Sequence, residues 1–374
     1  MAVDYQSLAV KGVQALSPYQ PGKPIDELAR ELGLDPTEII KLASNENPLG
    51  PSKKALAAAR KALDEMCLYP DGNGFELKQA LAKRFGITMN QITLGNGSND
   101  VLEVIARCFA DADSEIVYSQ YAFAVYPLVT LGIGARGIQV PAQDWGHDLD
   151  AMAEAVTERT KLIFVANPNN PTGTVHKADA VEAFLKKIPE HVLVVLDEAY
   201  CEYLTGADYP DGIELLQRYP NLIVCRTFSK AWGLAALRVG YAVSSPEIAD
   251  ILNRVRQPFN VDTVALAAAT AVLDDEDYLK RAREVNAAGL AQLCDGFDRM
   301  GLSYIPSAGN FVAVELGIQA QSVYHSLLEH GVIVRPIAGY GMPDHLRVSV
   351  GLPKENEHFL DVLAEALSAG GEEG

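Results

Sequence analysis

The sequence predicts an α/β protein with a mostly parallel central sheet in a large domain and a smaller α/β domain at its C-terminus. Short apolar runs alternate with helical stretches, which is typical of a parallel sheet whose two faces are covered by helices. The chain has 374 residues, more than the size at which one hydrophobic core usually stops growing. We therefore expect a large domain over residues 46–260 and a small domain over residues 261–374. Residues 1–45 are expected to form an N-terminal arm that belongs in part to the small domain.

The expected elements follow one another in a regular order. The prolines of the segment SPYQPGKP exclude a regular helix or a central strand there. Two helices are then expected at residues 53–66 and 74–85. Large-domain strands are expected near residue 92 and at residues 115–118, 161–166, 192–196, 223–225 and 241–243. A helix-rich stretch precedes the small-domain strands expected near residues 311–315, 332–335 and 346–350, and a terminal helix is expected from Glu355.

Charge and cysteine content argue against several classes of protein. The 31 basic and 49 acidic residues give a net charge of −18, whereas nucleic-acid and anionic-membrane partners both need a basic surface. The five cysteines are odd in number and show no C-x-x-C pairing, so we expect reduced thiols in the cytoplasm. No metal-ligand spacing appears among these cysteines and the seven histidines. Because no signal-peptide pattern or membrane-spanning run is visible, we expect a soluble, unprocessed protein.

Polar residues follow the expected strands at their carboxyl ends, where α/β sheets bind ligands. Lys230 is an unusual choice there, because a desolvated lysine with a lowered pKa can attack a carbonyl and form a Schiff base. An acid, Asp197, an amide, Asn170, and a phenol, Tyr200, follow neighbouring strands. An anion site is expected from Ser98, Thr227, Ser229 and Arg238. Each residue alone has an ordinary explanation, such as a helix cap or a surface lysine, but together they match the needs of pyridoxal 5′-phosphate.

Four motifs give the chain a family resemblance: NPNNPTG, DEAY, TFSKAWGLAALRVGY and LRVSVG. Their order and spacing resemble the aspartate-aminotransferase-like group, fold type I of the pyridoxal-phosphate enzymes, over nearly the whole chain. The segments SNENPLGPS, YPDG, LGNGSND and VIVRPIAGYGMPDHLRVSVG are most similar to the histidinol-phosphate aminotransferase family. This resemblance implies that Lys230 holds the cofactor as a Schiff base and shuttles a proton, while Asp197 pairs with the pyridine nitrogen. It also implies contacts to the ring oxygen from Asn170 and Tyr200, and to the phosphate from Ser98, Asn99, Thr227, Ser229 and Arg238.

The resemblance further implies a homodimer with shared active sites, to which the N-terminal arm contributes contacts. Tyr69 would reach the cofactor phosphate of the neighbouring subunit. Phe123 would stack on the cofactor ring, with Tyr121 as the rival, because the segment SQYAFAVY departs from the commoner proline-containing family pattern. The substrate anions would be bound by Arg335, Arg347, Tyr19 and Asn47.

The implied reaction is ping-pong transamination of L-histidinol phosphate with 2-oxoglutarate, giving imidazole-acetol phosphate and L-glutamate in histidine biosynthesis. Because arginines bind phosphate and carboxylate alike, an aromatic amino-acid (Phe/Tyr) aminotransferase and a threonine-phosphate-type decarboxylase remain alternatives. A binding or regulatory protein without turnover is disfavoured, since Lys230, Asp197 and Tyr200 are present together with both arginines. A nucleotide-binding α/β protein is also disfavoured, because LGNGSND lacks the third glycine of a dinucleotide fingerprint and the ending of a P-loop.

Overall fold

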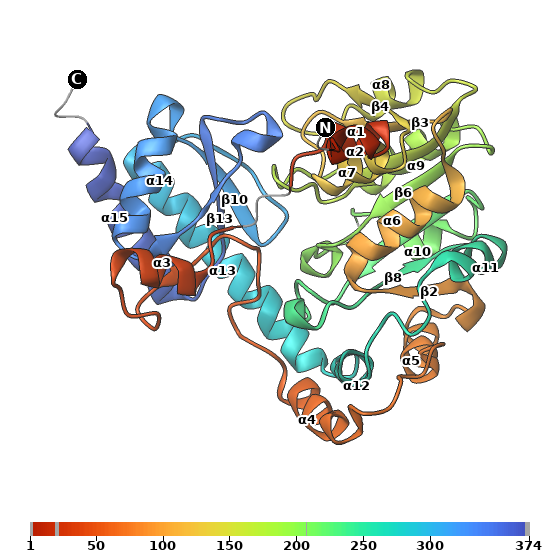
Figure 1. The fold of residues 1–374 in the computed structure, drawn as a ribbon. Helices are drawn as coiled ribbons and strands as arrows, with labels where there is room; N and C mark the ends of the chain where they lie inside the picture. The colour runs from red at the N-terminus through yellow and green to blue at the C-terminus, as the bar shows by residue number, and fades with distance from the viewer. Residues whose placement is uncertain (1–2, 19–21, 207, 371–374) are drawn as a thin grey trace.

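A seven-stranded sheet forms the centre of the larger part of the molecule in the computed structural model, which describes residues 3–18, 22–206 and 208–370 (Figure 1). The strand order is β2-β8-β7-β6-β5-β3-β4. β8 runs antiparallel to β2 and β7, and the other pairs are parallel, which confirms the predicted mostly parallel sheet. The strands are β2 (Ile92–Gly95), β3 (Glu115–Ser119), β4 (Arg136–Val140), β5 (Thr160–Ala166), β6 (Leu193–Asp197), β7 (Leu222–Thr227) and β8 (Gly240–Val243).

Both faces of this sheet are covered, as its continuous apolar strands require. Along β5, Ile163 and Val165 pack into one apolar cluster, whereas Leu162 and Phe164 pack into another. The first cluster is closed by α4 (Lys53–Ala62), α5 (Phe75–Phe85), α8 (Leu149–Glu154), α9 (Ala178–Lys187), α10 (Gly212–Leu215) and α12 (Thr263–Val272). The second cluster is closed by α6 (Gly97–Phe109), α7 (Val125–Gly132) and α11 (Pro246–Val255).

The C-terminal part contains a four-stranded antiparallel sheet with the order β12-β13-β10-β9. Its strands are β9 (Tyr304–Ile305), β10 (Phe311–Glu315), β12 (Arg335–Pro336) and β13 (His345–Ser349). A third apolar cluster joins this sheet to α13 (Glu276–Met300), α14 (Ala320–Glu329) and α15 (Pro353–Gly370). In Figure 1, α13 runs from the side of α12 toward α15 and so connects the two parts.

The N-terminal segment contacts both parts. β1 (Ile40–Lys41) pairs in parallel with β11 (Val332–Ile333), and α3 (Ile25–Leu32) packs on the same side. Two short helices, α1 (Tyr5–Leu8) and α2 (Lys11–Gln14), precede α3 in the chain, and α2 contacts α7 of the larger part. The domain limits given above stay a prediction. None of the helices within the described ranges has an apolar stretch long enough to cross a membrane.

Some elements differ from the prediction for local reasons. The strand expected at residues 332–335 is split between β11 and β12, and Pro336, which has no backbone N–H to donate, suits the edge position of β12. The helix expected at residues 53–66 ends at Ala62 and continues as a 3₁₀ turn, Leu63–Glu65. β4 lies outside the predicted strands because it sits at the sheet edge, where its residues are partly exposed and of mixed polarity.

Candidate active site

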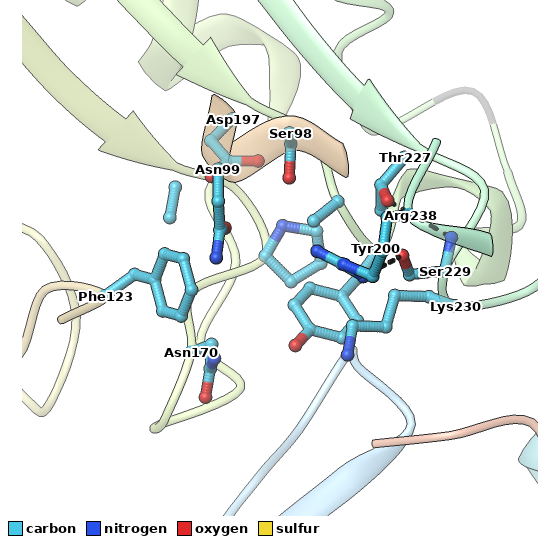
Figure 2. A pocket seen from close by; sticks show the side chains of 13 residues that line it. Ser98, Asn99, Phe123, Asn170, Asp197, Tyr200, Thr227, Ser229, Lys230 and Arg238 are labelled. Atoms are coloured by element: carbon cyan, nitrogen blue, oxygen red, sulfur yellow. Dashed lines mark hydrogen bonds between the residues drawn. The ribbon is translucent and has the colours of Figure 1, made fainter. Parts of the chain in front are cut away.

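The carboxyl edge of the seven-stranded sheet borders a cavity of about 130 Å³ (Figure 2). Ala166, Asp197 and Thr227, the last residues of three adjacent parallel strands, all line it. Most of the predicted site residues lie around this one space. They are Ser98, Asn99, Phe123, Asn170, Asp197, Tyr200, Thr227, Ser229, Lys230 and Arg238.

Lys230 lies in the loop that follows β7, with its side chain directed toward the cavity (Figure 2). Its Nζ donates a hydrogen bond to the backbone oxygen of Ser44 at 3.1 Å and lies 5.8 Å from the centroid of the Tyr200 ring. Burial, and then the nearby Arg347 guanidinium, lower the pKa of Lys230 to about 7. A large fraction of this amine is therefore neutral near neutral pH, as attack on a carbonyl requires.

Asp197 ends β6 and is almost fully buried. Its Oδ2 accepts a hydrogen bond from the Tyr126 hydroxyl at 2.9 Å, whereas Oδ1 is buried without a hydrogen-bond partner among the described residues. Burial raises the pKa of Asp197 to about 6, and the hydrogen bond from Tyr126 opposes this rise. A buried carboxylate oxygen left unpaired beside a cavity fits a ligand that brings a cationic N–H group, such as a protonated pyridine ring.

An anion site is built where the start of α6 meets the loop before β8. Ser98 and Asn99 lie in the first turn of α6, whose N–H groups have no partner within the helix. A Cβ atom on Gly240 would lie 2.5 Å from the Ser98 nitrogen, and a Cβ atom on Gly97 would lie 2.6 Å from Nη2 of Arg238. Both positions therefore need glycine for the helix, the strand and the arginine to come this close.

Two hydroxyl groups and a guanidinium complete this anion site. Nη1 of Arg238 donates to the Ser229 Oγ at 3.3 Å and to the backbone oxygen of Ala235 at 2.9 Å. The Ser229 backbone N–H donates to the Thr227 Oγ1 at 3.1 Å, which fixes the loop directly after β7. The site thus combines helix amides, hydroxyl donors and one permanent cation, a set suited to a phosphate group.

Tyr200 and Asn170 present hydrogen-bond donors on another side of the cavity. The Tyr200 hydroxyl accepts a hydrogen bond from Asn45 Nδ2 at 2.9 Å, and burial raises the pKa of Tyr200 to about 12, so the phenol keeps its own proton to donate. Oδ1 of Asn170 accepts a hydrogen bond from Nη1 of Arg347, which leaves the Asn170 NH₂ group as a donor. Both groups can therefore donate to an anionic ring oxygen.

Arg335 and Arg347 lie directly opposite each other on β12 and β13. Cross-strand partners share one face of a sheet, and two like charges in this position are unfavourable without an anion between or near them. Arg347 is buried and also donates from Nη2 to the backbone oxygen of Ala43 at 2.8 Å. Because Arg347 also contacts Asn170, which lines the cavity, Arg347 lies next to the cavity wall.

The two candidates for the ring-stacking residue lie in different surroundings. Phe123 lines the cavity, and its ring meets that of Tyr126 edge-on at 5.9 Å. Tyr121 instead packs against Trp145, with ring centroids 5.2 Å apart, and joins an apolar cluster of the C-terminal part. This arrangement favours Phe123.

Four predicted site residues that the structure describes do not line the cavity: Arg335 and Arg347, described above, and Asn47 and Tyr69. The Asn47 Nδ2 donates to the backbone oxygen of Ala231 at 2.9 Å and its Oδ1 accepts from the Leu49 N–H at 3.0 Å, so its amide supports the chain near Lys230. Tyr69 is 84% exposed and stacks on Phe259. Tyr19 lies outside the described residues. Their predicted roles, like those of the cavity residues, stay predictions.

Two residues that the sequence analysis does not identify hold predicted residues in place. Tyr126 has the appearance of an ordinary apolar position of α7, a helix that begins at Val125. Asn45 is hidden in a turn-rich segment, where it adopts a positive φ of 53° and contacts Tyr200. Neither residue gives a signal in the sequence beyond its type, because both act through contacts to residues that are distant in sequence.

Comparison with known proteins gives consistent results. Residues 37–363 match the family model described as aminotransferase class I and II. The chain is 60% identical over 370 residues to histidinol-phosphate aminotransferase 2 of Pseudomonas fluorescens, covering 99% of this chain and 100% of that protein. It is 61% identical over 365 residues to the protein of the same name from Pseudomonas aeruginosa, covering 98% and 99% of the two chains.

A solved structure shares the fold. It is the crystal structure of histidinol-phosphate aminotransferase from Sinorhizobium meliloti in complex with pyridoxal-5′-phosphate. The TM-score is 0.89 at 33% sequence identity, with 97% of this chain and 98% of that chain covered.

Proposed function

This chain belongs to the class I and II aminotransferase family, and from that premise we propose that it transfers the amino group of L-histidinol phosphate to 2-oxoglutarate with pyridoxal 5′-phosphate as cofactor. The products are imidazole-acetol phosphate and L-glutamate, in a step of histidine biosynthesis. The observation that carries the proposal is the buried Oδ1 of Asp197, which has no hydrogen-bond partner in the described part of the chain and shares one cavity with Lys230 and the anion site. The names of the relatives favour this activity over an aromatic aminotransferase or a decarboxylase.

Each group around the cavity has a defined task in this proposal. The bound cofactor supplies an electron-withdrawing ring that accepts the electrons released at the substrate Cα. Lys230 would hold the cofactor through its amine in the neutral form and, when freed from it, would act as the base that carries the proton of the substrate Cα. Asp197 keeps the ring nitrogen protonated, while Asn170 and Tyr200 donate to the ring oxygen.

The remaining residues bind the anionic groups. The cofactor phosphate is assigned to the anion site formed by Ser98, Asn99, Thr227, Ser229 and Arg238, and the ring face to Phe123. Arg335 and Arg347 bind the phosphate of histidinol phosphate in one half-reaction and the carboxylates of 2-oxoglutarate and glutamate in the other, because a guanidinium suits both anions. Tyr19 and Asn47 are assigned to the same substrate side.

A comparison of amino donors tests this function. We expect kcat/KM for histidinol phosphate, measured with 2-oxoglutarate, to exceed the values for phenylalanine and tyrosine by roughly 10²-fold or more, because a phosphate brings more negative charge and more acceptor oxygens to the two arginines than the carboxylate of an amino acid does. Equal or higher values for phenylalanine or tyrosine would instead identify an aromatic aminotransferase.

A cytoplasmic homodimer completes the proposal. The exposed Tyr69 ring, stacked on the half-exposed Phe259, is available to reach the cofactor phosphate of a neighbouring subunit. Exposed apolar side chains nearby support an interface on this surface: Leu56, Leu63, Met66, Leu68 and Phe75. The cytoplasmic location is supported by the five cysteines, all of which are free thiols.

Mixed dimers test the shared site. Lys230→Ala and Tyr69→Ala homodimers are both expected to be impaired, while subunit exchange at equal amounts should restore about one quarter of the wild-type activity. After exchange, half of all dimers in the mixture are heterodimers, and each heterodimer has one intact site and one defective site in a two-fold assembly. The matched control mixes Lys230→Ala with Asp197→Ala, whose heterodimers have no intact site. No recovery in the first mixture, despite demonstrated exchange, would rule out the role of Tyr69 across the interface.

A further inference from the structure

Tyr126 is held in a fixed position behind the cavity. It is fully buried, and its ring stacks on Phe164 with centroids 4.6 Å apart and an interplanar angle of 8°. The Phe123 ring meets it nearly at right angles. Its hydroxyl donates to Asp197 Oδ2 at 2.9 Å. A phenol packed on two sides has little freedom to turn away from its acceptor.

This contact makes the two oxygens of Asp197 different. Oδ2 is used by Tyr126, so Oδ1, which has no partner among the described residues, is left for the cavity. We propose that Tyr126 is the positioning residue of Asp197, which fixes the carboxylate so that Oδ1 meets the ring nitrogen of the cofactor. This inference rests on the proposed function, because it assigns the cavity to pyridoxal 5′-phosphate.

The hydrogen bond also maintains the charge of Asp197. Burial favours the neutral acid and raises its pKa, whereas a donor to the ionised form favours the carboxylate. The titratable groups that face Asp197 are Tyr126 of α7, Cys225 of β7, and Tyr200 and Lys230 of the loops after β6 and β7. Among these, Tyr126 makes a direct side-chain hydrogen bond to the carboxylate.

Tyr126→Phe removes the hydroxyl and keeps the stacked ring. The probe is pyridoxamine 5′-phosphate, which binds the apoprotein without a covalent link to Lys230, and its Kd is measured from pH 5 to pH 9. We expect about tenfold weaker binding at pH 8, the size of a lost hydrogen bond to a charged group. Affinity should fall as pH drops through the pKa of Asp197, and this fall should occur at higher pH in the variant, because the ionised acid has lost a donor.

Tyr118→Phe is the matched control. Tyr118 is a buried tyrosine in the same apolar cluster, with its hydroxyl over Gly137 of β4 and away from the cavity lining. Its Kd profile should match that of the wild type. The inference would be overturned if Tyr126→Phe bound pyridoxamine 5′-phosphate more weakly by the same factor at every pH, with the fall in affinity at low pH occurring at the same pH as in the wild type. Tyr126 would then have a packing role alone.

A second variant covers the case in which Tyr126→Phe does not fold. Site-specific 3-fluorotyrosine at position 126 keeps the ring and makes the hydroxyl a stronger donor, so the fall in affinity should occur at lower pH than in the wild type. A fall at an unchanged pH counts against the inference. Asp197→Asn distinguishes a failure of the proposed function from a failure of the positioning role of Tyr126. If this variant binds pyridoxamine 5′-phosphate as the wild type does, the proposed function itself fails. If Asp197→Asn weakens binding and both changes at Tyr126 leave the profile unaltered, the positioning role alone fails.

Discussion

Replacing Lys230 by alanine is expected to abolish the covalent link to pyridoxal 5′-phosphate that borohydride reduction traps. The same change should lower kcat by roughly 10⁴-fold, because it removes both the amine that carries the cofactor and the base that moves the substrate proton. The physical reason is the environment of this amine, because burial and then Arg347 lower its pKa to about 7 and so leave a large fraction of it neutral at neutral pH. Trapping followed by peptide mapping identifies the modified residue, and single-turnover absorbance changes report the rate.

Lys177→Ala provides a matched control, since Lys177 is an exposed lysine that pairs with Asp208 on the surface. Trapping and turnover should be unchanged in this protein. A trapped adduct on any lysine other than Lys230 in the wild type would contradict the assignment, as would normal turnover by Lys230→Ala.

Arg347→Ala is expected to weaken the binding of both substrates. A charge-assisted hydrogen bond contributes about 1.5–3 kcal/mol, so KM for histidinol phosphate and for 2-oxoglutarate should each rise by roughly 10- to 100-fold. Arg347→Lys should recover little of this loss, because an ammonium cannot reproduce the planar, two-pronged contact of a guanidinium. Steady-state kinetics with each substrate varied in turn measure both effects.

Arg299→Ala is the control for this series, because Arg299 is exposed at the end of α13. Binding of pyridoxamine 5′-phosphate to Arg347→Ala should be reported beside the kinetics, since Arg347 also contacts Asn170 in the cavity wall. Unchanged KM values for both substrates in Arg347→Ala would show that this arginine does not bind substrate anions.

Much of the central sheet was predictable because its strands are defined locally. β5, β6 and β7 are buried along nearly their whole length, so each appears in the sequence as an unbroken apolar run. The apolar run at residues 332–335 was predicted as one strand, but the structure divides it into β11 and β12. The division depends on pairing with β1 and β13, which are distant in sequence.

The cavity residues were predictable for a chemical reason. Lys230, Asp197 and Asn170 follow different strands, and parallel strands bring their carboxyl ends to one edge of the sheet. Tyr126 and Asn45 act through contacts that only the folded chain creates, across 71 and 155 positions of sequence. A tyrosine in an apolar helix and an asparagine in a turn are too common for either to be identified from its type.

The groups assigned to the cofactor and those assigned to the substrate anions come from different sheets. Asp197 and Lys230 follow strands of the seven-stranded sheet, whereas Arg335 and Arg347 lie on β12 and β13 of the four-stranded one. Arg347 is the link between the two sets, because it also contacts Asn170 and lowers the pKa of Lys230. Directed evolution that keeps Arg347 and varies β12 and the turn after it can therefore change which amine the enzyme accepts, while the reaction centre on the other sheet is inherited unaltered.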